Sequence, residues 1–156
     1  MAYAESASDY SFRLRIQEMA LKIDHREREG IEIVDLDGRL MFGEEDLQFR
    51  NEIDTLVRTG KNRVVLNLTG LAEVDTTGLG TLLFALAKLR KAGGGLALLN
   101  LRSSHIELLE LAKLETVFEV FDDEQEAINS FFPGREVRRH DILEFIQTLR
   151  KKKAES

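Results

Sequence analysis

The sequence predicts an α/β fold with a mixed, largely parallel β-sheet, helices packed over that sheet and an added C-terminal helix. Short apolar runs alternate along the chain with segments of helical periodicity. The run at 63–68 is almost continuously apolar, as in a strand that is covered on both faces. Strands that alternate with helices favour parallel pairing, because each crossover helix packs back onto the sheet. The 156 residues are enough for one domain with a core of its own.

The first half of this predicted domain contains two strands, a helix and the central strand. Strand-like alternation runs through 21–23 and 31–36, and a charged turn ending at Gly30 separates the two runs. Gly38 then indicates a bend or a close backbone approach. A helix is expected over 44–59, since three acids occupy its first turn and a glycine follows its end.

The second half continues the alternation. Leucines recur at helical spacing over 77–91, and three consecutive glycines end this helix. Ser104 and Glu107 form a capping-box pattern for the next helix. Asp122 or Asp123 is expected to cap the last helix of the domain, which ends near the break at 133–134. The remaining predicted elements are strands at 96–99 and 117–121 and helices at 104–114 and 123–132.

Three regions are therefore predicted: a flexible N-terminal arm at 1–20, a domain at 21–133 and a C-terminal extension at 134–156. The extension contains an amphipathic helix that Asp141 is placed to cap, with its apolar residues on one face. Two interpretations stay open for this helix. It either packs on its own domain, or it serves self-association, as in a homodimer, or partner docking.

Composition and charge limit the classes of function. The chain has 43% apolar and 32% charged residues, no cysteine, and no apolar run near the length of a membrane span, so a cytoplasmic globular protein is expected. Its net charge of −6 argues against nucleic acid and against an anionic membrane as partners. Eight acids against one base occupy 105–133, whereas seven bases against four acids occupy 135–156. These stretches are either solvated surfaces, or the acidic one meets a basic partner.

The segment Asp75-Thr76-Thr77-Gly78-Leu79-Gly80 lies between the central strand and the following helix. One interpretation is structural, because Asp or Thr at this position can cap the helix. The other is functional, because a helix N-terminus tolerates an added phosphate, which carries about −1.5 to −2 charges. At a docked surface that charge would be buried beside a carboxylate, and a penalty of ~2.8 kcal/mol is about a hundredfold in affinity. The two glycines are expected to let another surface approach closely.

This segment and its surroundings resemble the STAS family, which bacterial anti-sigma factor antagonists typify. The resemblance covers about 21–132 and rests on the matching of several segments at the right spacing: Val65-Leu66-Asn67-Leu68, Val74 to Leu82, Gly93-Gly94-Gly95-Leu96, Gly38, Val117 to Phe121 and Glu126-Ala127.

The resemblance implies a binding switch and no catalysis. In the phosphorylated members, a serine kinase that doubles as an anti-sigma factor modifies the hydroxyl after the motif aspartate, and a phosphatase reverses the modification. By position the acceptor here is Thr76, with Thr77 as the alternative. The partner-binding residues that this resemblance suggests are Asp75, Thr76, Thr77, Gly78, Leu79, Met41 and Phe42. For Met41 and Phe42 the other interpretation is burial in the core.

Two departures from the family pattern keep a second function open. The family more often has two serines where this chain has Thr76-Thr77, and many members carry an acid at the place of Met41. The alternative is a STAS assembly subunit that is not phosphorylated, such as a stress-signalling scaffold or the cytoplasmic component of a lipid-transport complex. An enzyme is not expected: the three histidines are predicted to lie on the surface, and no catalytic, metal or cofactor site is predicted.

Overall fold

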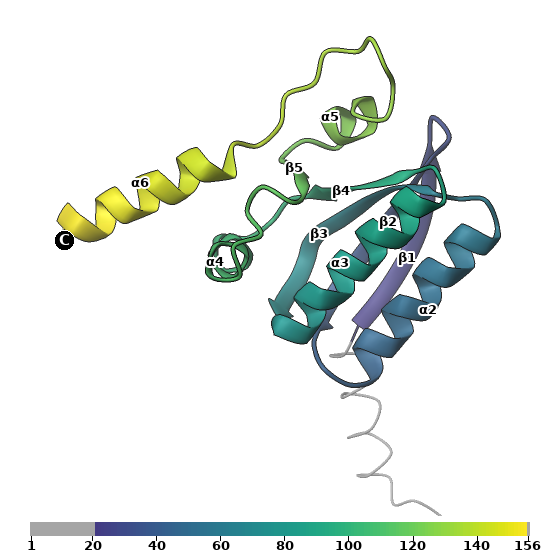
Figure 1. Cartoon of the computed structure of the whole chain (residues 1–156), viewed down its shortest axis with the longest axis horizontal. Helices are drawn as coiled ribbons and strands as arrows, with labels where there is room; N and C mark the ends of the chain where they lie inside the picture. Colours follow the sequence, from purple (N-terminus) through teal and green to yellow (C-terminus); the bar gives the residue numbers. More distant parts are fainter. Residues whose placement is uncertain (1–20, 156) are drawn as a thin grey trace, which may run out of the picture.

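A computed structural model describes residues 21–155, so the predicted arm at 1–20 lies outside the described residues (Figure 1). One sheet has five strands in the order β1-β2-β3-β4-β5. β1 is antiparallel to β2, and the other neighbouring pairs are parallel. The strands are β1 (Leu21–Arg28), β2 (Ile31–Leu40), β3 (Arg63–Val74), β4 (Gly95–Leu99) and β5 (Glu119–Phe121).

The helices follow the strands in the predicted order: α2 (Glu44–Arg58), α3 (Thr76–Lys91), α4 (Ser103–Leu111), α5 (Glu124–Asn129) and α6 (Ile142–Glu155). The predicted fold class, a mixed and largely parallel sheet covered by helices, is confirmed. Asp123 caps α5 by accepting a hydrogen bond from the Glu126 amide, and Asp141 accepts one from the Glu144 amide. The predicted cap at Ser104 is wrong, because α4 begins one residue earlier, with Arg102 at the N-cap and no side-chain cap bond.

The two faces of the sheet carry separate apolar cores. Alternate residues of β3 point to opposite faces, so Val64 and Leu66 join the core under α2 and α3, while Val65 joins the core under α5. This two-sided burial explains the continuous apolar run at 63–68. Figure 1 shows α2 and α3 side by side over the same face of the sheet.

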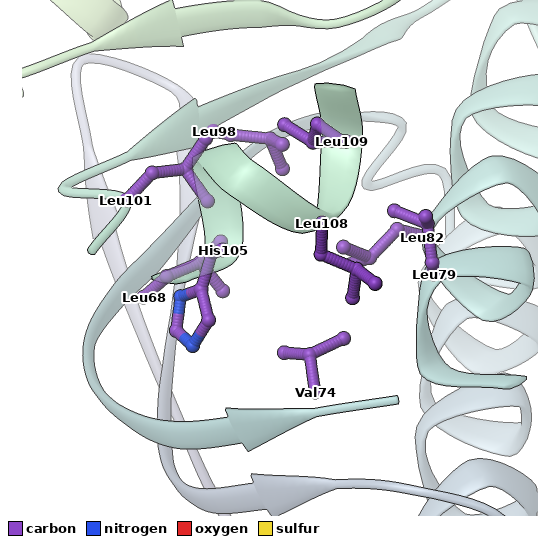
Figure 2. A pocket seen from close by; sticks show the side chains of 9 residues that line it. All are labelled: Leu68, Val74, Leu79, Leu82, Leu98, Leu101, His105, Leu108 and Leu109. Atoms are coloured by element: carbon purple, nitrogen blue, oxygen red, sulfur yellow. The ribbon is translucent and has the colours of Figure 1, made fainter. Parts of the chain in front are cut away.

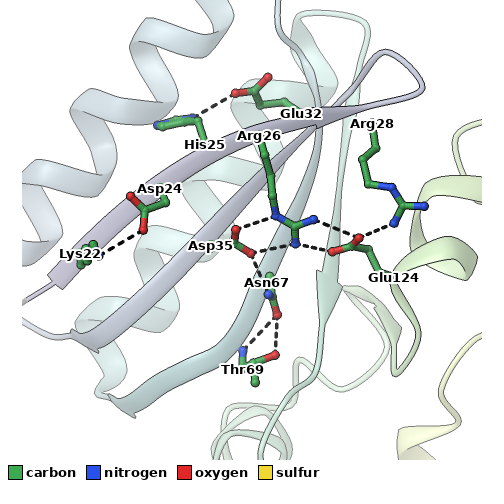
Figure 3. Close-up of polar contacts among 10 residues, drawn as sticks. All are labelled: Lys22, Asp24, His25, Arg26, Arg28, Glu32, Asp35, Asn67, Thr69 and Glu124. Atoms are coloured by element: carbon green, nitrogen blue, oxygen red, sulfur yellow. Dashed lines mark hydrogen bonds and ion pairs between the residues drawn. The ribbon is translucent and has the colours of Figure 1, made fainter.

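An ion-pair network ties the β1–β2 hairpin to α5 across the second face (Figure 3). The Arg26 guanidinium donates to Asp35 at 2.7 Å and to Glu124 at 3.0 Å, and Arg28 also pairs with Glu124. Arg26 is the main cause that lowers the pKa of both carboxyl groups, and these in turn raise the pKa of Arg26. Asn67 extends the network to β3 by donating to Asp35 at 2.8 Å. These ion pairs hold α5 on the sheet in addition to the apolar contacts that Ala127 and Ile128 of α5 make with this face.

The C-terminal extension packs on its own domain. Ile142 and Ile146 of α6 are buried in the same core as α2 and α3. Three bases of the extension pair with acids of the stretch at 105–133, namely Arg139 with Glu119, Arg150 with Glu110 and Lys153 with Glu107, whereas Arg135 pairs with Glu29. Three of the eight acids thus meet bases of the chain's own tail, through ion pairs whose bases stay more than half exposed. Among residues 21–155, no helix has the length and the apolar character that a membrane crossing needs.

Candidate functional site

The candidate site forms where two chain segments meet at the carboxyl ends of the parallel strands β2 and β3. The β2–α2 loop leaves the sheet after Leu40, and the turn into α3 leaves it after Val74, the residue paired with Leu40. The Asp75 carboxylate joins the two segments. Its Oδ1 accepts from the Gly78 amide at 2.8 Å, and its Oδ2 accepts from the Phe42 amide at 2.9 Å.

Asp75 is therefore both a helix cap and a clamp on the neighbouring loop. Its backbone is extended, and its amide donates to the Leu40 carbonyl at 3.4 Å. The first amides of a helix lack partners within the helix, so the carboxylate satisfies the Gly78 amide and places negative charge at the positive end of α3. Of the residues that could cap this helix, the structure selects Asp75 over the two threonines.

The threonines that follow the cap are free of this structural task. Thr76 is exposed and Thr77 is half-buried. Within residues 21–155, neither hydroxyl makes a hydrogen bond. Thr76 is thus exposed, and the cap bond does not involve its hydroxyl. The partial positive charge of the helix N-terminus favours an anion at this place.

Phe42 lies beside this turn with its side chain in solvent. Its backbone amide is held by Asp75, yet the residue is 81% exposed. Leu47, in the first turns of α2, is a second exposed apolar residue of this region, while Met41 is half-buried. A rigid backbone that presents an exposed aromatic ring is typical of an anchor for a protein partner.

Two residues predicted to bind a partner lie inside the domain instead. The Leu79 side chain is 4% exposed and belongs to the main core. Gly78 is buried, and a Cβ atom built on it would lie 2.1 Å from the Leu40 carbonyl oxygen. The close approach at Gly78 is thus one between α3 and the end of β2, and not one to a partner. A Cβ atom on Gly80 would meet no atom within 4 Å, so this glycine does leave open space at the surface.

A buried polar contact between α2 and α3 was not predicted. Thr81 has no exposed surface, and its hydroxyl contacts both the Thr77 carbonyl, at 3.0 Å, and the Asp46 carboxylate. Arg50 donates to Asp46 at 3.1 Å and places its guanidinium 4.7 Å from the centre of the Phe84 ring. The signal in the sequence was a single hydroxyl among the leucines on the buried face of the helix. This contact fixes the start of α2 against the start of α3.

His105 lies behind the turn, in a pocket lined by aliphatic side chains (Figure 2). The prediction that His105 is a surface residue is wrong, because the residue is 6% exposed and, among the described residues, only the Ala72 backbone offers its ring a polar contact. Burial lowers the pKa of its imidazole. Two residues of the pocket lining flank the cap Asp75 in the sequence: Val74 precedes it, and Leu79 follows in the first turns of α3. The full lining is Leu68, Val74, Leu79, Leu82, Leu98, Leu101, His105, Leu108 and Leu109.

Comparison with known proteins defines the class to which this fold and turn belong. The family model described as the STAS domain matches residues 22–127. The chain therefore belongs to the STAS domain family, and the predicted resemblance is confirmed.

Among individual proteins, the chain is similar to the anti-sigma F factor antagonist of Paenibacillus polymyxa. The two are 26% identical over 110 residues, which cover 70% of this chain and 94% of the relative. Two solved structures share the fold. The Bacillus cell fate determinant SpoIIAA in its phosphorylated form has a TM-score of 0.55 at 22% identity, over 71% of this chain and 98% of that one. An anti-sigma factor antagonist from Mycobacterium paratuberculosis has a TM-score of 0.61 at 16% identity, over 71% and 93%. The fold also occurs in transporter proteins.

The two glycines of the turn form a matched pair for testing the close approach of α3 to β2. We expect Gly78→Ala to lower the free energy of unfolding by about 2 kcal/mol or more, because the new methyl group meets a backbone carbonyl that cannot move aside. Gly80→Ala should be neutral or should stabilise by up to about 1 kcal/mol, since the helix gains propensity and the space is open. Urea unfolding of the two variants measures both. Equal stabilities would contradict the close approach.

The buried imidazole predicts a pH-dependent stability. Because burial holds the pKa of His105 below its ordinary value of about 6.5, the unfolded chain binds a proton that the folded chain does not. The free energy of unfolding should therefore fall as the pH drops below about 6.5. His105→Leu should show a smaller fall between about pH 7 and pH 5 than the unchanged chain in urea unfolding. Identical pH profiles would show that His105 is not buried in its neutral form.

Proposed function

We propose that this protein is an anti-sigma factor antagonist that docks on an anti-sigma factor with kinase activity through the turn at Asp75-Thr76-Thr77. In this proposal the kinase phosphorylates Thr76, the modified protein dissociates, and a phosphatase restores binding. The observation that carries the proposal is the division of roles within the turn. Asp75 holds the helix and the loop, while the adjacent Thr76 hydroxyl is exposed and makes no hydrogen bond among the described residues.

The chemistry of the turn supports a switch that leaves the fold intact. A phosphothreonine at the first residue of α3 would add about −1.5 to −2 charges at the end of the helix that favours anions. The first turn of α3 contains no acidic residue that would oppose it from within the helix. In the isolated protein this charge stays in water, so the cost to the fold is small.

The same charge is costly once a partner covers the turn. In the complex, the phosphate would lie between the Asp75 carboxylate and the partner surface that packs on the exposed Phe42 ring. Burying a charge without a counter-charge costs several kcal/mol, whereas ~2.8 kcal/mol already weakens binding about a hundredfold. One phosphate can thus release a partner that an apolar anchor holds.

The proposal is tested by comparing charge at Thr76 with the same charge elsewhere. The unchanged chain is first used to capture and identify the anti-sigma kinase, which is then purified for titration calorimetry. Thr76→Ala should bind this kinase within about twofold of the unchanged chain, and Thr76→Glu should bind it at least about tenfold more weakly. Thr55→Glu is the matched control, since it places a carboxylate on an exposed threonine in the last part of α2 and should bind normally.

Two further variants test which threonine is the switch position and whether the Phe42 ring contributes to binding. Thr77→Glu, measured in parallel, shows which of the two threonines is the switch position. Phe42→Ala should weaken binding without changing stability, because its ring is in solvent. If both Thr76 variants keep every partner of the unchanged chain, the switch is refuted. The assembly subunit, with Thr76 as an ordinary surface residue, then becomes the better account.

A further inference from the structure

The C-terminal tail, residues 134–155, lies beyond the part of the chain that defines the family. The family model ends at residue 127, and the Paenibacillus relative is matched over 94% of its length by 110 residues of this chain. The tail nevertheless has a defined place in the structure. It crosses to the β5 edge, where the His140 amide donates to the Val120 carbonyl at 2.8 Å, and it continues as α6 beside α4.

The tail rests on a surface that we call the helix seat, formed by the apolar residues Phe118 and Val120 and the acids Glu107, Glu110 and Glu119. Ile142 and Ile146 of α6 belong to the same buried cluster as Phe118 and Val120. Around this apolar contact, three bases of the tail pair with the three acids of the seat: Arg139 with Glu119, Arg150 with Glu110, and Lys153 with Glu107 at 4.0 Å. The seat thus binds a helix that has an apolar stripe along one face and positive charge beside that stripe.

This docking is shallow. Arg150 and Lys153 keep 71% and 78% of their side-chain surface in solvent, and ion pairs with that exposure contribute little and are screened by salt. A hollow also remains between the seat and the tail, lined by Phe118 and Val120 on one side and by His140, Ile142 and Leu143 on the other. The apolar part of the contact consists of the buried Ile142 and Ile146 with the partly buried Phe145, a small set that a competing helix can displace.

We propose that the helix seat is a docking site for a basic amphipathic helix of a partner protein, and that α6 occupies this site within the chain as a competitor. The charge of the seat region supports a basic occupant, because residues 105–133 carry eight acids and one base. The occupant that the structure shows has this chemistry, with apolar residues spaced four apart and four consecutive bases at 150–153. The proposal is independent of the switch at Thr76.

Competition within one chain sets the expected size of the effect. A segment tethered by a short linker acts at an effective concentration in the millimolar range. If the untethered tail binds the open seat with a dissociation constant of about 100 μM, the closed form outweighs the open form about tenfold, and a partner helix binds the intact protein about tenfold more weakly than the opened one. Opening the tail should reveal a site that the intact protein hides.

The test uses the full chain and a fluorescent peptide with the sequence of residues 134–155. The tail is opened by Ile142→Asp with Ile146→Asp, or more mildly by Arg150→Glu with Lys153→Glu, which changes exposed side chains only. Fluorescence anisotropy should show the peptide binding to the chain with Ile142→Asp and Ile146→Asp at least about tenfold more tightly than to the unchanged chain, with the charge-reversed chain between the two. The unfolding transition of each chain shows that its domain is folded.

Charge reversal of the seat provides the control. In the chain opened at Ile142 and Ile146, Glu107→Lys with Glu110→Lys should weaken peptide binding by about threefold or more, whereas Glu44→Lys with Glu73→Lys, the same charge change at exposed residues elsewhere, should leave it unchanged. Equal peptide binding to opened and unchanged chains, or none to either, would overturn the proposal. So would a peptide that binds anionic phospholipid vesicles but not the opened chains, or a dimer of the unchanged chain that Ile146→Asp dissolves, since the tail would then serve a lipid surface or a second copy.

Discussion

One carboxylate, that of Asp75, holds together the region on which the function depends. It accepts the Gly78 amide at the start of α3 and the Phe42 amide of the β2–α2 loop, and so it joins two segments that are far apart in the sequence. The missing side chain at Gly78 lets α3 come close enough to the Leu40 carbonyl for both bonds to form. About one turn further along α3, Thr81 and Asp46 add a contact between α3 and α2. The turn is therefore rigid before any partner arrives.

This rigidity explains how a small domain could carry a switch at one hydroxyl. A regulatory charge on a capping residue would damage the helix, whereas a charge on the next residue leaves the cap bonds untouched. The exposed Phe42 ring is held on the same clamp, so an apolar anchor and a modifiable hydroxyl share one fixed surface. The tail differs from this surface, because it is held by a reversible contact between a basic helix and the acidic helix seat. The chain thus has one surface suited to modification and another suited to competition.

The sequence predicted the order of elements because apolar periodicity and glycine breaks reflect burial and chain direction directly. It did not predict that β3 continues to Val74, because Thr69-Gly70 looks like a turn when the pairing with β2 is unknown. Within the site, the cap at Asp75 agrees with the pattern. The pattern left Phe42 open between the core and the surface, and Gly78 and Leu79 were assigned to a partner although they face the domain. The burial of His105 and the contact of Thr81 depend on which helices become neighbours, and a single sequence does not contain that information.

The proposed switch requires that Asp75 keep both of its hydrogen bonds when Thr76 carries a phosphate. Hydrogen exchange of the Phe42 and Gly78 amides, measured by NMR on a chain with phosphothreonine at position 76, tests this directly. We expect both amides to exchange as slowly as in the unmodified chain, within about threefold. Loss of protection at either amide would mean that the phosphate breaks the clamp, and that any release of a partner follows from local unfolding.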